Sequence, residues 1–330
     1  MNRNSFLRST LALAALTAGA GRLAVPAHAQ AAGWPNKPIR MVVNFPPGGS
    51  PDIVARAVAR PLSEALGQAI TIDNRSGAGG IVGADAAAKS PADGYTFLLS
   101  SGSALAIVPL LNNKLPFDPN KDLVPVAGGA RLELFLVVRS DLPINNYADF
   151  IRYTKANPGK LSYGSPGNGT SPHIAGEMLK SQAGIFTVHI PYRGSGAVLQ
   201  DMLGGRVDYS FDPGIAFQHI KSGRLRLIAV GSAKRSGLFP DTPTLNELGL
   251  TGFDAGTTHG FWAPAGTPPE IVSRMNTEIN RALGLPDVVA AIRALGAEPH
   301  VLTPAQFGQV IQADRQRYGV IVKDRKITQD

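Results

Sequence analysis

The chain has 330 residues, of which 44% are hydrophobic, and it carries a formal net charge of +8 with no cysteine. This length suffices for two domains, and the lack of cysteine excludes a disulfide framework, so stability must come from burial of an apolar core. Basic residues are dispersed instead of forming runs, which argues against nucleic acid as a partner and leaves a mild positive field that attracts small anions.

Residues 1–29 have the pattern of a secretory signal peptide. Arg3 and Arg8 form a positive n-region, an apolar stretch follows, and residues 27–29 are an A-x-A cleavage site. The apolar stretch is too short to span a bilayer, and no cysteine follows it to carry a lipid anchor. We therefore expect an exported, periplasmic protein that begins at Gln30, with a net charge of +5 once the three signal arginines are removed.

The first strand-to-helix unit of the mature chain lies within residues 39–66. Apolar side chains alternate along 39–45, as in a buried strand, and the prolines and glycines of 46–49 require a sharp turn. Ser50 is predicted to be the N-cap of the following helix and Pro51 its first residue. The free N–H groups of such a helix start favour an anion, although a plain strand-to-helix connection has the same pattern.

Strands and helices then alternate, which predicts an α/β fold with doubly wound, parallel sheets. Further strands are expected at 69–73, 95–99, 187–190, 207–211 and 225–230, and helices at 84–89, 104–111, 146–154, 214–222, 269–283, 287–295 and 304–322. Two strand-rich segments, 124–138 and 260–264, are predicted to cross between two domains.

A second unit, at residues 161–175, repeats the architecture of the first. It combines a strand, a glycine-rich turn, a Ser171-Pro172 helix start and a helix. The two units lie in opposite halves of the chain, so they could face each other across a cleft, each with a helix start that favours an anion. Together they are more informative than either is alone.

Catalytic and metal-binding motifs are not evident. The sequence has no G-x-S-x-G elbow, no H-E-x-x-H and no P-loop, and its histidines are widely spaced, so we expect no enzyme activity, no metal and no cofactor. Ser50, His173 and Asp212 all lie at predicted strand ends, which leaves an exported α/β hydrolase as an alternative. Helix starts explain Ser50 and His173 better than a catalytic triad does.

Two further polar residues have an open interpretation. Asp212 follows a predicted strand, where it either caps the next helix or offers a hydrogen-bond acceptor in the cleft. Arg193, beside Tyr192 in a turn, either pairs with an anion or is simply an exposed arginine.

Several motifs together resemble the Bug family, the solute-binding receptors of tripartite tricarboxylate transporters. The runs Trp34-Pro35-Asn36-Lys37-Pro38 and Phe45-Pro46-Pro47-Gly48-Gly49 resemble the start of that family. The similarity continues in order through residues 74–80, 163–169, 191–194, 203–208 and 263–268.

The resemblance implies a type II periplasmic binding protein, with two doubly wound α/β domains joined by two crossing strands. The domains would comprise residues 30–129 with 263–330, and residues 130–262. The protein would be a monomer that captures a small organic carboxylate and delivers it to the membrane permease subunits of the transporter. A receptor that feeds a signalling sensor is a further alternative.

The resemblance also implies which residues hold the ligand. One carboxylate would be clasped by the two glycine-rich turns, through Phe45, Gly48, Gly49 and Ser50 on one side and Asn168, Gly169, Thr170, Ser171 and His173 on the other. Ser101 and Asp212 lie where family members line the cleft.

Three departures from the family pattern stand out. Pro51 replaces the usual Thr, and Pro61 within the first helix predicts a kink. Thr258 and His259 stand where an aromatic pair is common, which predicts a polar far end of the ligand. An imidazole with an ordinary pKa would also make binding of an anion stronger as His259 protonates at mildly acidic pH.

Overall fold

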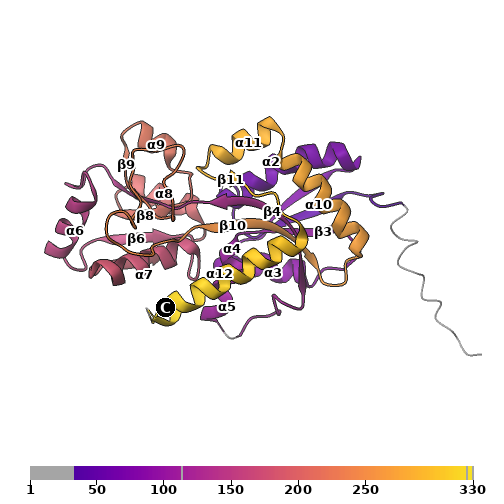
Figure 1. The fold of residues 1–330 in the computed structure, drawn as a ribbon, viewed down its shortest axis with the longest axis horizontal. Coiled ribbons are helices and arrows are strands. Elements are labelled where there is room, and N and C mark those ends of the chain that lie inside the picture. The colour runs from indigo at the N-terminus through magenta and orange to yellow at the C-terminus, as the bar shows by residue number, and fades with distance from the viewer. Residues whose placement is uncertain (1–32, 113, 325, 329–330) are drawn as a thin grey trace, which may run out of the picture.

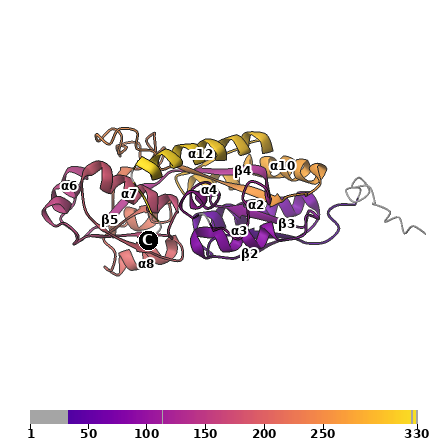
Figure 2. The same cartoon turned by 90° about the horizontal axis from the view of Figure 1, so that it is seen from below.

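The computed structural model describes residues 33–112, 114–324 and 326–328. The predicted signal peptide and its cleavage site lie outside the described residues. Two separate β-sheets, each flanked by helices, form two lobes that lie side by side (Figures 1 and 2). The α/β fold with two doubly wound units is therefore confirmed.

Lobe 1 is built on a six-stranded sheet in the order β11-β4-β10-β3-β1-β2. Its strands are β1 (Ile39–Val43), β2 (Ile70–Asn74), β3 (Thr96–Ser100), β4 (Leu123–Leu132), β10 (Thr257–Pro264) and β11 (Glu298–Pro299). Its helices are α2 (Ser50–Leu66), α3 (Ile81–Ala88), α4 (Gly102–Ala106), α5 (Val108–Leu111), α10 (Pro269–Leu283), α11 (Pro286–Arg293) and α12 (Pro304–Asp324), with the 3₁₀ turn η1 (Ala78–Gly80) before α3.

Lobe 2 is built on a five-stranded sheet in the order β7-β6-β8-β5-β9. Its strands are β5 (Phe135–Arg139), β6 (Ser162–Ser165), β7 (Val188–Pro191), β8 (Tyr209–Asp212) and β9 (Leu225–Val230). Its helices are α6 (Tyr147–Ala156), α7 (Ser171–Ala183), α8 (Ser195–Leu203) and α9 (Phe217–Lys221).

Neither sheet is wholly parallel, which corrects the sequence-based expectation. β1 pairs in parallel with β2 and β3, and β6 pairs in parallel with β7 and β8, because these strands belong to consecutive strand–helix units. The strands next to the crossings behave differently: β10 is antiparallel to β3 and β4, and β5 is antiparallel to β8 and β9. β10 and β5 are the strands by which the chain enters lobe 1 and lobe 2, so each runs away from the cleft. Each is therefore antiparallel to neighbours whose carboxyl ends face the cleft.

The chain crosses between the lobes twice. The first crossing is the short link of residues 133–134 between β4 and β5, within the expected segment 124–138. The second is the longer segment 231–256 between β9 and β10. The expected crossing at 260–264 is wrong, because those residues lie inside β10 in the sheet of lobe 1.

The C-terminal helix α12 fastens the second crossing. Arg317 Nη2 donates to the carbonyl of Gly256 (2.8 Å) and to Asp314 Oδ1 (2.8 Å), and the Tyr318 hydroxyl donates to the same carbonyl (3.1 Å). Arg317 also pairs with Asp254 Oδ2 at 3.3 Å. The helix lies along the junction, with its C-terminal end toward α7 (Figure 1).

The two faces of each sheet pack into different cores. Alternate residues of β1, such as Met41 and Val43, pack with Phe261 of β10 into a core whose buried residues all belong to lobe 1. On the other face, one continuous cluster includes Trp262 of lobe 1 and Tyr163 of lobe 2. The lobes are thus held together by a shared apolar layer on one side of the junction.

The helix starts differ slightly from the sequence-based prediction. The N-caps of α2 and α7 are Gly49 and Thr170, so Ser50 and Ser171 are the first helical residues instead of the caps. Helix α2 also continues through Pro61 to Leu66, so the proline does not end it. Within the described ranges, no helix is both long and apolar enough to cross a membrane.

Candidate functional site

The turn between β1 and α2 is shaped by Asp52. Its carboxylate accepts hydrogen bonds from the Gly48 N–H, from Arg56 Nε and from Asn74 Nδ2, each at 2.9 Å. Burial opposes ionisation of this carboxyl, but the hydrogen bonds outweigh burial and hold the pKa of Asp52 below its usual range. Gly48 has a φ of +78°, which favours glycine, and its engaged N–H makes it part of the turn's frame.

Asn44, which follows β1 and is fully buried, braces the neighbouring loops. Its Nδ2 donates to Ser100 Oγ (2.9 Å) and to the Gly80 carbonyl (3.2 Å), and its Oδ1 accepts from the Ser101 N–H (3.2 Å). A Cβ at Gly80 would lie 2.7 Å from Asn44 Nδ2, so only glycine fits this approach. Asn44 therefore fixes the carboxyl edge of the lobe 1 sheet, and the sequence analysis did not single it out.

The turn between β6 and α7 is stabilised by hydrogen bonds within the turn and to the first residues of α7. The Gly169 N–H donates to His173 Nδ1 (3.1 Å), and Thr170 Oγ1 donates to the Gly167 carbonyl (2.6 Å). His173 is buried, and its ring stacks on His189 with centroids 4.3 Å apart. An Nδ1 that accepts from Gly169 requires the neutral tautomer with its proton on Nε2.

The two turns meet at a small buried cavity, here called the inner cavity, of about 30 Å³. Its polar lining comes from both lobes and consists of Ser50, Ser101, Ser103, Thr257 and His259 from lobe 1 and Thr170, Ser171 and Ser195 from lobe 2. Ser50 and Ser171 are the first residues of α2 and α7, where backbone N–H groups have no partner within the helix. The cavity thus offers hydroxyls and two helix starts to one small acceptor group.

His259 contacts Ser50 at the floor of the inner cavity. Its Nε2 lies 3.0 Å from Ser50 Oγ, and the residue is only 3% exposed. Burial lowers the pKa of His259 to about 3, so the imidazole stays neutral in mildly acidic solution. The expectation that protonation of His259 strengthens binding at such pH is therefore wrong.

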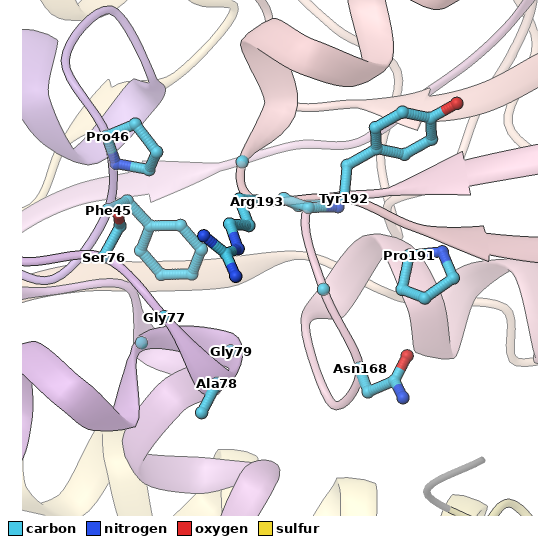
Figure 3. A pocket seen from close by; sticks show the side chains of 14 residues that line it. Phe45, Pro46, Ser76, Gly77, Ala78, Gly79, Asn168, Pro191, Tyr192 and Arg193 are labelled. Atoms are coloured by element: carbon cyan, nitrogen blue, oxygen red, sulfur yellow. The ribbon is translucent and has the colours of Figure 1, made fainter.

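A second, larger cavity, here called the outer cavity, lies beside the inner one and has a volume of about 280 Å³. Phe45 and Pro166 form part of the wall of both. The rest of the outer lining is residues 76–80 and Pro46 from lobe 1, and residues 167–168 and 191–194 from lobe 2 (Figure 3). Arg193 extends toward Phe45 across this space, whereas the Tyr192 ring points away and its hydroxyl donates to Asp201 Oδ2 (2.8 Å).

The residues predicted from sequence fall into two groups. Those lining a cavity are Phe45, Ser50, Ser101, Asn168, Thr170, Ser171 and His259. Those outside both linings are Gly48, Gly49, Gly169, His173 and Asp212, of which Asp212 lines a smaller neighbouring cavity that shares Pro166, Ser195 and Pro213 with the inner one. The sequence analysis named no ligand-binding role for the 76–80 turn or Pro166, although the glycine clusters around them were a usable signal, and it left Arg193 open between an anion partner and an exposed arginine.

Asp212 acts as a local cap. Its Oδ1 accepts from the N–H groups of Gly214 (2.8 Å) and Ala216 (2.9 Å), which fixes the turn before α9. Burial raises the pKa of Asp212 to about 6, against the opposing effect of these hydrogen bonds. The imagined triad does not form, because Ser50 contacts His259 while Asp212 and His173 bind backbone N–H groups of their own turns.

Among residues 33–112, 114–324 and 326–328, no group of three or more His, Cys, Asp or Glu side chains could hold a metal ion.

Comparisons with known proteins agree with this architecture. A family model described as the tripartite tricarboxylate transporter family receptor matches residues 54–327. Protein BugT of Bordetella pertussis is 42% identical over 294 residues, which cover 88% of this chain and 90% of BugT.

Three solved structures are similar over nearly their whole length. The periplasmic binding protein BugD has a TM-score of 0.85 and 31% identity, covering 90% of this chain and 100% of BugD. An R. palustris protein determined with adipate has a TM-score of 0.86 and 35% identity, covering 89% and 99% of the two chains. MatC from Rhodopseudomonas palustris with bound malate has a TM-score of 0.83 and 30% identity, covering 88% and 100%.

Proposed function

Because this chain belongs to the tripartite tricarboxylate transporter receptor family, whose members are periplasmic solute-binding receptors, we propose that it captures a small organic carboxylate in the cleft between its lobes. It then delivers this ligand to the membrane permease subunits of a tripartite-type transporter. The two lobes act as rigid domains, whose bounds differ from the expected 30–129 with 263–330 and 130–262 because β4 to Leu132 and all of β10 (Thr257–Pro264) lie in the sheet of lobe 1. The mature protein works in the periplasm after cleavage before Gln30. The ligands of two similar structures, adipate and malate, support the carboxylate class.

One observation carries this proposal: hydroxyls from both lobes line one buried cavity at the starts of α2 and α7. Ser50 and Ser171 offer side-chain hydroxyls there, next to N–H groups that lack a helical partner. A carboxylate has lone pairs enough to accept from both lobes at once. No charged side chain lines this cavity, so recognition rests on hydrogen bonds and helix dipoles.

A hydrolase is the second candidate, because Ser50 Oγ lies 3.0 Å from His259 Nε2. Two properties of His259 argue against it. A catalytic histidine needs a pKa near the working pH, whereas burial lowers the pKa of His259 to about 3. A triad also needs a group that orients the imidazole, whereas His259 Nδ1 is buried with no hydrogen-bond partner among the described residues.

Binding is tested with a panel of organic acids and the purified mature protein. A ligand present at about 100 times its Kd should stabilise the folded state by about 2.7 kcal/mol, which a thermal-shift assay detects. Calorimetry on the hits should then show that Ser171→Ala weakens binding by about 1.5 kcal/mol, the lower end of the range for one hydrogen bond to a charged group. Ser181→Ala, on the far part of α7 away from both cavities, serves as the matched control.

The result also separates the candidate functions. Stabilisation by no acid in the panel would contradict the receptor proposal, and turnover of ester substrates that Ser50→Ala abolishes would favour the hydrolase. Loss of uptake on deleting the permease, with the ligand still bound by the receptor, would favour transport over signalling to a sensor.

A further inference from the structure

His259 and Ser50 are joined by a buried hydrogen bond at the floor of the inner cavity. His259 Nε2 lies 3.0 Å from Ser50 Oγ, although the two residues are 209 positions apart in the chain. Each residue is only 3% exposed, and both line the cavity. Either group can donate in this bond, so its direction decides what the Ser50 hydroxyl presents to a ligand.

The direction of the bond follows from the second ring nitrogen of His259. The imidazole is neutral, because burial lowers its pKa to about 3, so it carries one proton. Its Nδ1 is buried and has no hydrogen-bond partner among the described residues. A proton on Nδ1 would be an orphaned donor, whereas a proton on Nε2 leaves an unused acceptor at Nδ1, and buried orphaned N–H groups are the rarer of the two in native proteins. Nε2 is therefore the donor, and Ser50 Oγ accepts.

A hydroxyl that accepts from His259 keeps its own proton free. Within the described part of the chain, Ser50 Oγ has no hydrogen bond besides the one to His259. Its proton can therefore go to an acceptor in the cavity, where no carboxylate side chain competes for it. In the opposite tautomer the serine proton would be engaged by His259, and Ser50 would turn a lone pair toward an anion.

Neighbouring hydroxyls in the inner cavity are already engaged. Thr170 Oγ1 donates to the Gly167 carbonyl (2.6 Å), and the Oγ atoms of Ser101 and Ser103 share one hydrogen bond at 2.7 Å. At the start of α2, the hydroxyl that faces the cavity is that of Ser50. The orientation of this one hydroxyl thus matters for how lobe 1 holds an anion.

We propose that His259 is a positioning residue, whose Nε2–H donates to Ser50 Oγ and so fixes the Ser50 hydroxyl as a donor to the bound carboxylate. This inference rests on the proposed function. Hydrogen bonds in such a chain polarise one another, so the imidazole strengthens the serine as a donor without placing a cation in the cavity.

The position of the proton is measured by nitrogen-15 NMR of wild type labelled at its histidines, with His259→Gln used to assign the signal. The probe is the tightest-binding acid of the panel, which includes adipate and malate. The two nitrogens of a neutral imidazole give well-separated signals, so the spectrum reports the tautomer directly. The protein saturated with this acid should carry the His259 proton on Nε2. A proton on Nδ1 would overturn the proposal.

A double-mutant cycle, measured by calorimetry with the same acid, tests whether Ser50 depends on His259. Ser50→Ala should weaken binding about tenfold in the wild-type background, a difference of about 1.4 kcal/mol. It should weaken binding by no more than about twofold when His259 is already Phe, because the serine then has no donor to orient it. His259→Gln, whose amide can donate to Ser50, should restore part of the Ser50 effect.

Ser171→Ala provides the matched comparison. Ser171 begins α7 in the other lobe, so its substitution should weaken binding by the same factor whether residue 259 is His or Phe. If Ser50→Ala also has the same effect in both backgrounds, the role of His259 is overturned while the receptor function stands. Loss of the Ser171 effect together with the Ser50 effect in both His259 variants would likewise contradict a specific positioning role. If no acid of the panel binds wild type, the receptor proposal itself fails.

Discussion

His259 gives the most direct quantitative test of the site as it is folded. The imidazole is buried, and burial lowers its pKa to about 3, whereas in the unfolded chain it should titrate near its ordinary value of about 6.5. Between about pH 6.5 and pH 3, His259 binds a proton in the unfolded state but stays neutral in the folded state. This histidine therefore destabilises the fold progressively as pH falls from about 6.5 toward 3.

The size of the effect follows from the two pKa values. Each pH unit in this window costs about 1.4 kcal/mol, so lowering the pH from about 7 to about 5 should remove about 2 kcal/mol of unfolding free energy through His259 alone. His259→Gln removes the titration. Any fixed loss of packing or of the Ser50 contact lowers the stability of the variant equally at both pH values, so it cancels from the comparison.

The assay is urea unfolding of both proteins at the two pH values, with linear extrapolation to water. Wild type should lose about 2 kcal/mol more than His259→Gln between the two conditions. His219→Gln, which removes an imidazole from α9 outside the cleft, controls for the substitution itself. Equal pH sensitivity of wild type and His259→Gln would refute the neutral, buried state of His259, and with it the reasoning that anion binding here does not use an imidazolium.

Three further outcomes are expected. Gly194→Ala should weaken ligand binding and hinder closure of the cleft, because its Cβ would lie 2.8 Å from Pro46 Cγ and its φ of +106° favours glycine. Calorimetry measures the binding and small-angle scattering the closure. Gly196→Ala, whose Cβ meets open space, should bind normally. Wild type should lose about 2 kcal/mol of unfolding free energy as pH rises from about 4 to about 7, because the folded state, with a pKa of about 6 at Asp212, binds this proton more tightly than the unfolded state does. Asp212→Asn should not show this loss in urea unfolding, and matching pH profiles of the two proteins would contradict the raised pKa. Intact mass spectrometry of the periplasmic protein should show a chain that begins at Gln30, and retention of residues 1–29 would contradict the predicted cleavage.

Local sequence signals predicted most of the secondary structure. The helix Pro269–Leu283 and the strand Leu225–Val230 have the predicted bounds, and Asn146 caps α6 through a hydrogen bond from the Asp149 N–H. These elements have strong periodicity and clear boundaries. Sheet topology was harder, because strand direction near the crossings depends on which lobe the chain is entering, and no local pattern records this.

The site was predicted unevenly for a similar reason. The two helix starts at Ser50 and Ser171 were visible as glycine-rich turns followed by Ser-Pro. The burial of His259, its depressed pKa and its contact with a serine 209 positions away depend on tertiary packing. Likewise, an arginine in a turn looks the same in sequence whether it faces a cavity or bulk solvent, so Arg193 could not be assigned.

Closure of the cleft and binding of the ligand are best understood as one event. The rims of the lobes meet closely at Pro46 with Gly194 and at Gly79 with Asn168, where added Cβ atoms would lie 2.8 and 2.6 Å from the opposite lobe. In this closed arrangement the inner cavity has room for two or three water molecules at about 10–15 Å³ each, which is comparable to one carboxylate. A ligand must therefore enter an open form, and it can shift the lobes toward closure only through contacts that the open form lacks. Hydroxyls supplied jointly by Ser50 and Ser171 provide such contacts, since one small anion can reach both only when the lobes are together.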